Sequence, residues 1–195
     1  SLMALDVEKI EHQKRLARKM GFRNAVSNVF TSSEDRRRLL HDLEENIEKV
    51  ETQKGYLLLM GLDRMSLVNE IYGNEFVDEL LQTVENMLKR VMQDKAEIYH
   101  IAGDIFAIYF KDANTGSMWE TANDILQVFY NQTIDVQERS IHQVVSIGGV
   151  RIEDKKTSVS SVLSRAELAL MDAKNKGRGC FIEYSDKLGE EVRAF

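Results

Sequence analysis

The feature that most constrains the fold is a pair of apolar runs, residues 97–102 and 105–110, joined by a Gly-Asp step. Both runs are rich in aromatic and β-branched residues, and a Gly-Asp step between two such runs is typical of a tight β-hairpin. Asp104 is therefore expected at the hairpin tip. A carboxylate in this place is either an ordinary turn residue or a metal ligand on a rigid scaffold, and the function depends on which of the two it is.

Strands and amphipathic helices alternate along the rest of the chain. Continuous apolar runs predict buried strands, at 56–60, 144–152 and 180–184. Apolar residues at helical spacing predict helices, at about 34–52, at two places within 65–92, at 118–129 and at 162–173. The resulting βααββαβαβ order predicts an α/β sandwich, in which helices pack on one mixed sheet with the antiparallel hairpin at its centre.

Composition limits the classes of function. The 195 residues are 43% apolar, enough for one domain with a sizeable core and a possible appendage. A net charge of −6 argues against a surface that wraps nucleic acid but is compatible with a nucleotide bound through divalent cations. Cys180 is the single cysteine, which excludes an intramolecular disulfide and a cysteine zinc cluster. No run reaches the roughly 18–20 apolar residues of a membrane span, and no secretory signal is recognisable, so we expect a cytoplasmic domain.

Residues 2–20 are dense in good helix formers but carry only a thin apolar stripe, through Val7, Ile10, Leu16 and Met20. Two interpretations of this predicted helix are open. It is either a solvated N-terminal helix or a linker helix that pairs with its copy in a homodimer.

Several segments together resemble the GGDEF domains, the diguanylate cyclases. The hairpin reads Ala102-Gly103-Asp104-Ile105-Phe106 where that family reads Gly-Gly-Asp/Glu-Glu-Phe. Residues 58–74 resemble the first strand of the family and the turn after it, and residues 145–148 resemble its fourth-strand Val-Ser-Ile-Gly. Residues 166–178 resemble its Ala-Asp-x-Ala-Leu-Tyr-x-Ala-Lys-x-x-Gly-Arg segment. The resemblance implies a ferredoxin-like, nucleotidyl-cyclase palm-type sandwich over 28–195, preceded by a helical linker or signalling helix over 1–27.

The resemblance also implies an activity. Diguanylate cyclases join two GTP molecules into cyclic di-GMP, each half of a dimer presenting one GTP, while Mg²⁺ or Mn²⁺ neutralises the charge that develops in phosphoryl transfer. The guanine-reading pair of the family falls on Asn69 and Asp78, and its triphosphate-binding basic residues fall on Lys174 and Arg178. Both pairs also have ordinary structural interpretations, as cap or turn residues and as cations near a helix C-terminus.

The metal-binding positions depart from the pattern of the family. The backbone carbonyl of Leu62 and the carboxylate of Asp104 remain as possible ligands. The other two carboxylate positions fall on Gly61 and Ile105, which cannot ligate a cation through their side chains. The phosphate-contacting lysine of the first helix falls on Ser66. The resemblance therefore implies that roughly half of the metal ligands are lost, and that both losses are carboxylates.

Neither a nearby carboxylate nor the inhibitory motif of the family is expected to restore the lost features. Asp63 lies two residues beyond Gly61, and on an extended strand its side chain would be displaced by about 6–7 Å along the same face, too far to substitute without a bulge. The product-inhibition motif of the family falls on Gln93 and Ala96, so no inhibitory site is expected.

These observations favour a degenerate GGDEF domain in cyclic di-GMP signalling. The leading hypothesis is a catalytically silent module that acts through dimerisation, partner contact or residual guanine-nucleotide binding, with Mg²⁺ or Mn²⁺ present only together with nucleotide. The alternative is a weak diguanylate cyclase that uses Asp104 and a rearranged metal site. A nucleic-acid-binding ferredoxin-like domain is disfavoured by the acidic balance. The family further leads us to expect an upstream sensor domain in the full-length protein.

Overall fold

A computed structural model describes the backbone of residues 29–193 and, apart from 29–33, 115 and 190–193, their side chains. The predicted helix over 2–20 and the boundary of the linker lie outside the described residues. Within them, no helix is both long enough and apolar enough to span a bilayer.

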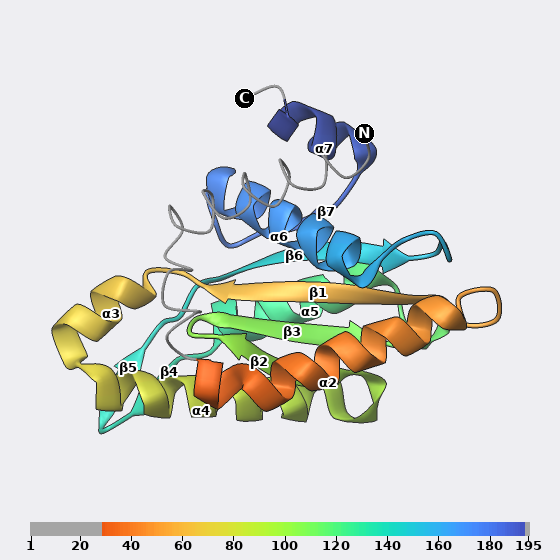
Figure 1. Ribbon diagram of the computed structural model, residues 1–195. Coiled ribbons are helices and arrows are strands. Elements are labelled where there is room, and N and C mark those ends of the chain that lie inside the picture. Colours follow the sequence, from red (N-terminus) through yellow and green to blue (C-terminus); the bar gives the residue numbers. More distant parts are fainter. Residues whose placement is uncertain (1–28, 194–195) are drawn as a thin grey trace.

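One five-stranded sheet forms the middle layer, in the order β2-β3-β1-β6-β7 (Figure 1). The bounds of its strands are β1 Gly55–Leu62, β2 Glu97–Ala102, β3 Ile105–Phe110, β6 Val145–Ile152 and β7 Phe181–Glu183. All neighbouring strands are antiparallel except β6 and β7, which are parallel. The mixed sheet and the hairpin are confirmed. One expectation was wrong: the centre of the sheet is β1, and the hairpin places β3 beside it and β2 at an edge.

Helices cover both faces of this sheet (Figure 1). The helical bounds are α2 Val29–Glu48, α3 Met65–Tyr72, α4 Asn74–Met92, α5 Met118–Asn131, α6 Val159–Asn175 and α7 Asp186–Arg193, with short 3₁₀ turns at η2 Gln93–Lys95 and η3 Ala113–Thr115. Helices α4 and α5 pack on one face, and α2 and α6 pack on the other.

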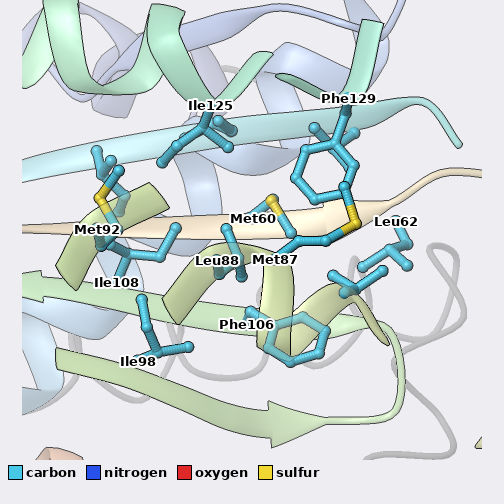
Figure 2. Packing of buried hydrophobic residues seen from close by; sticks show 14 of the residues in the cluster. Met60, Leu62, Met87, Leu88, Met92, Ile98, Phe106, Ile108, Ile125 and Phe129 are labelled. Carbon is cyan, nitrogen blue, oxygen red and sulfur yellow. The ribbon is translucent and has the colours of Figure 1, made fainter. Parts of the chain in front are cut away.

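Every residue of β1 is buried because the strand has a core on each side. Leu58, Met60 and Leu62 face the core under α4 and α5, part of which Figure 2 shows, whereas Leu57 and Leu59 face the core under α2 and α6. A strand covered on both faces buries successive side chains on opposite sides. The continuous apolar run in the sequence follows from this arrangement.

Gly148 allows α6 to approach the sheet closely. A Cβ atom on Gly148 would lie 2.1 Å from the backbone nitrogen of Leu170 and 2.6 Å from the carbonyl carbon of Ala169. Only glycine permits such contact between a strand and the backbone of a helix. The paired glycines of this strand, which predict either a bulge or a close backbone approach, therefore mark a close approach.

Two elements were absent from the sequence-based prediction. A small separate hairpin pairs β4 Ile134–Val136 with β5 Arg139–Ile141, and α7 follows β7. The turn between β4 and β5 holds Gln137 and Glu138 at φ values of 50° and 65°. Glycine, asparagine and aspartate are the usual residues at such angles, so the sequence carries no hairpin signal here.

Candidate functional site

A cleft of about 620 Å³ opens at the carboxyl end of β1. The hairpin tip, the start of α3 and the last turn of α6 surround it. The hairpin tip is fixed to the end of β1, because the backbone N–H of Leu62 donates to the carbonyl of Asp104 at 2.9 Å. The residues that line the cleft are Leu62, Arg64, Met65, Ser66, Leu67, Asp104, Met171, Lys174, Asn175 and Arg178.

Asp104 stands in the turn between β2 and β3, as predicted, and its half-buried carboxylate lines the cleft. Burial raises the pKa of this carboxyl above its ordinary value, the nearby Lys174 ammonium opposes the rise, and Asp63 adds to it. Next to this turn, His100 stacks on Phe106, and its Nε2 lies 3.0 Å from the carbonyl oxygen of Gly103. These contacts of His100 hold the turn that carries the Asp104 carboxylate.

Asp63 is buried and belongs to a network beside the cleft. Its carboxylate accepts a hydrogen bond from the Ser146 hydroxyl at 3.0 Å and pairs with Arg178 at 3.4 Å. Its backbone carbonyl accepts a hydrogen bond from the side-chain amide of Gln143 at 2.9 Å. Burial raises the pKa of Asp63, whereas the Ser146 hydrogen bond and neighbouring cations lower it. Asp63 is absent from the residues that line the cleft, so the geometry gives no support to its use as a substitute metal ligand.

Lys174 fills the space above Gly61. A Cβ atom on Gly61 would lie 2.9 Å from Cε and 3.1 Å from Nζ of Lys174, and 3.5 Å from Cδ1 of Ile105. The Lys174 ammonium also interacts electrostatically with the carboxylates of both Asp63 and Asp104. A side-chain cation thus stands at the position where the sequence resemblance places the first metal carboxylate.

These residues do not fit a pair of divalent cations. Mg²⁺ requires oxygen ligands in near-octahedral geometry, and the cleft offers the Asp104 carboxylate and the Leu62 carbonyl beside a lysine ammonium. Ile105 is only 1% exposed and packs in the core under α2 and α6. Elsewhere in the described part of the chain, one group with suitable spacing, formed by His41, Asp42 and Glu45, lies along α2.

The predicted phosphate-binding residues come together, whereas the predicted guanine pair lies apart from them. Lys174 and Arg178 both line the cleft. Asn69 on α3 and Asp78 on α4 are exposed and are absent from its lining. The base-binding role of Asn69 and Asp78 therefore stays a prediction.

Sequence reasoning missed five of the lining residues, namely Arg64, Met65, Leu67, Met171 and Asn175. Arg64 precedes α3 with φ 59° and brings a further cation to the cleft, two positions before Ser66, where the family has lysine. Met171 and Asn175 line the same wall as Lys174. Helical spacing could have found this wall, since positions three and four residues apart share one face of a helix.

The fold is that of the catalytic domains of diguanylate cyclases. The active GGEEF domain of a diguanylate cyclase from Vibrio cholerae superposes with a TM-score of 0.68 at 20% identity, over 76% of this chain and 96% of that domain. The GGDEF domain of DgcB from Caulobacter crescentus, solved in complex with c-di-GMP, gives a TM-score of 0.67 at 20% identity, over 78% of this chain and 89% of that one. At this level of identity the likeness concerns the fold alone.

The family model described as "Diguanylate cyclase, GGDEF domain" matches residues 26–180, and the chain therefore belongs to the GGDEF family. Diguanylate cyclase DgcZ of Escherichia coli is 29% identical over 151 residues, which is 77% of this chain. The chain spans about half of the length of that relative, 51%.

Proposed function

We propose that this GGDEF domain is catalytically silent and acts in cyclic di-GMP signalling by binding a guanine nucleotide or by contacting a partner or a second copy. The observation that carries the proposal is the replacement of metal-binding carboxylates by Gly61 and Ile105, with the Lys174 side chain over the first of them. Phosphoryl transfer of this kind depends on metal ions to offset the developing charge.

Electrostatic repulsion supports the proposal that the cleft does not bind two divalent cations. Two unit charges 4 Å apart interact by about 4 kcal/mol at a surface-like dielectric constant, and a divalent cation doubles this value. The ammonium of Lys174 therefore opposes a cation placed beside it. Asp104 is the one carboxylate among the described lining residues, and a single acidic side chain leaves such a cation dependent on water and on phosphate oxygens.

The proposed nucleotide binds in the same cleft. Lys174 and Arg178 supply cations for phosphates, and Asn69 and Asp78 are the proposed base contacts. By analogy with the family, the segment before residue 28 is the proposed dimerisation helix and the connection to an upstream sensor domain.

A weak diguanylate cyclase is the second candidate. It is favoured by one observation: the Asp104 carboxylate and Leu62 both line the cleft. In that case Asp104 would hold the metal together with the Leu62 carbonyl and the phosphates of GTP.

An activity assay separates the two candidates. The chain is incubated with GTP and either Mg²⁺ or Mn²⁺, and cyclic di-GMP is measured by chromatography, with an active diguanylate cyclase as the positive control. We expect no product. Product that disappears in Asp104→Ala and persists in Asp124→Ala, an exposed carboxylate on α5, would establish the weak cyclase instead.

A further inference from the structure

We infer that the cleft binds the polyphosphate of a nucleoside triphosphate directly, with the Lys174 ammonium in the place of a divalent cation, so that binding does not require metal. This inference rests on the proposed function, in that it takes the cleft to be a nucleotide site without cyclase chemistry. Its starting point is the position of Lys174, whose Nζ would lie 3.1 Å from a Cβ atom on Gly61.

The charge of the cleft suits an anion. Arg64, Lys174 and Arg178 line it, against Asp104 as the single lining carboxylate among the described residues. Asp63, the other nearby carboxylate, is buried under Ser146 and pairs with Arg178. The lining therefore carries an excess of positive charge before any metal is added, whereas a site with two more carboxylates would need metal to attract phosphates.

The cations also lie on more than one wall. Lys174 belongs to the last turn of α6, Arg178 follows that helix, and Arg64 lies between the end of β1 and the start of α3. A chain of phosphates between these walls can accept hydrogen bonds from two directions. Charge-assisted hydrogen bonds to phosphate are among the stronger polar contacts in proteins.

Asp63 positions Arg178 for this role. One terminal nitrogen of the guanidinium contacts the carboxylate at 3.4 Å. A guanidinium has five N–H donors in a planar fork, so the contact with Asp63 orients the group and uses only one of its nitrogens. Arg178 is thereby held at the rim although its side chain is 48% exposed.

Binding of GTP to the full chain, measured by calorimetry in EDTA and in excess Mg²⁺, tests the inference. We expect an affinity in EDTA that equals or exceeds the affinity in Mg²⁺, because Mg²⁺ neutralises phosphate charge. Lys174→Ala should weaken binding in EDTA about tenfold or more. Lys111→Ala is the matched control, since this exposed lysine follows β3 at the end of the sheet away from the cleft. It should leave the affinity unchanged.

A second pair of variants changes Gly61, the residue under the end of the Lys174 side chain. In Gly61→Asp the new Cβ comes closest to the flexible end of Lys174 and makes an ordinary contact with Ile105. Its carboxylate should neutralise the ammonium. We expect weaker binding in EDTA and a new enhancement by Mg²⁺. Gly61→Asn has nearly the same shape without the charge and should not gain dependence on Mg²⁺.

The outcomes separate this inference from the proposed function. Binding that requires Mg²⁺ would overturn the inference and leave a silent domain standing, whereas formation of cyclic di-GMP would overturn the silent domain itself. Inorganic triphosphate and ATP serve as further probes. Equal affinity for GTP, ATP and inorganic triphosphate supports recognition through the phosphates alone. A preference for GTP in EDTA supports recognition through the phosphates together with a contact to the guanine base. Absence of binding by GTP at millimolar concentration in both buffers would also overturn the inference.

Discussion

The guanidinium of Arg178 reaches the buried carboxylate of Asp63 at 3.4 Å, across 115 positions of sequence. This pair connects the segment after α6 to the end of β1. Ser146 on β6 joins it, because its hydroxyl donates to Asp63 and accepts a hydrogen bond from the backbone N–H of Gly179 at 3.2 Å. Three segments of the chain, the end of β1, strand β6 and the residues after α6, thus meet at one buried acid.

The stability contributed by Asp63 should depend on pH. Burial raises the pKa of Asp63 above the ordinary 3.8 in spite of the Ser146 hydrogen bond and nearby cations. A raised pKa in the folded state means that this group stabilises the fold below pH 3.8 and loses that contribution as the pH rises through the folded pKa. Asp63→Asn should therefore gain stability relative to the unmodified chain between pH 3.8 and neutral pH.

Urea denaturation at several pH values measures this difference. The control is Asp63→Ala, which removes the acceptor of the Ser146 hydroxyl and should destabilise the protein by about 1–3 kcal/mol. A difference between the Asn variant and the unmodified chain that falls as the pH rises would mean that the ion pair with Arg178 outweighs burial.

The ionisation of Asp104 should respond to Lys174. Burial raises the pKa of Asp104, and Lys174 is the first of the groups that lower it. Lys174→Met keeps the length of the side chain and removes the charge, so the pKa of Asp104 should rise further. Carboxyl carbon chemical shifts followed through a pH titration report this pKa. Lys111→Met should leave the pKa of Asp104 unchanged. An unchanged pKa of Asp104 in Lys174→Met would contradict the proximity of the two charges.

Gly148 should tolerate no side chain. A methyl group there would overlap the backbone of Leu170 at 2.1 Å, and overpacking of this kind costs about 1–3 kcal/mol or more. Gly148→Ala should lower the thermal midpoint strongly. Gly61→Ala on the adjacent strand is the comparison, because the tightest contact of its methyl group is with the flexible end of the Lys174 side chain at 2.9 Å. Equal losses in both variants would contradict the close approach of α6 to β6.

Arg38 should stabilise the edge strand β2. Its guanidinium lies 4.2 Å from the centre of the Tyr99 ring and donates to the carbonyl of Ile98 at 2.9 Å, joining α2 to β2. Arg38→Ala should cost about 1–2 kcal/mol of unfolding free energy. Arg38→Lys keeps the charge but loses the planar fork, and should recover only part of the loss. Hydrogen exchange at the amides of β2 would locate the effect, and full recovery in the lysine variant would argue for charge alone.

Most of the main elements could be predicted because each has a strong local signal. The run over 56–60 reads as a doubly covered strand, and the hairpin at Gly103-Asp104 reads from its flanking runs. The small β4–β5 hairpin could not be predicted, because its turn places Gln137 and Glu138 at positive φ angles, which these residue types rarely adopt. The place of β1 at the centre of the sheet depends on pairing between distant strands, which local patterns do not contain.

The site was predicted only in part for a similar reason. The sequence register indicated that a carboxylate is missing at Gly61, but it could not indicate what occupies the space. Lys174 reaches that space from a helix more than a hundred positions later, and only the packing of α6 on the sheet decides the distance. The engagement of Asp63 by Arg178 is likewise a property of the folded chain.

The contact at Gly148 has a consequence for ligand selection. Leu170, the residue that rests on Gly148, precedes Lys174 by one helical turn. The position of the Lys174 ammonium over Gly61 is consequently constrained by a strand residue that does not line the cleft. Any substitution that lifts α6 from the sheet would retune anion recognition from a distance while leaving every cleft side chain intact.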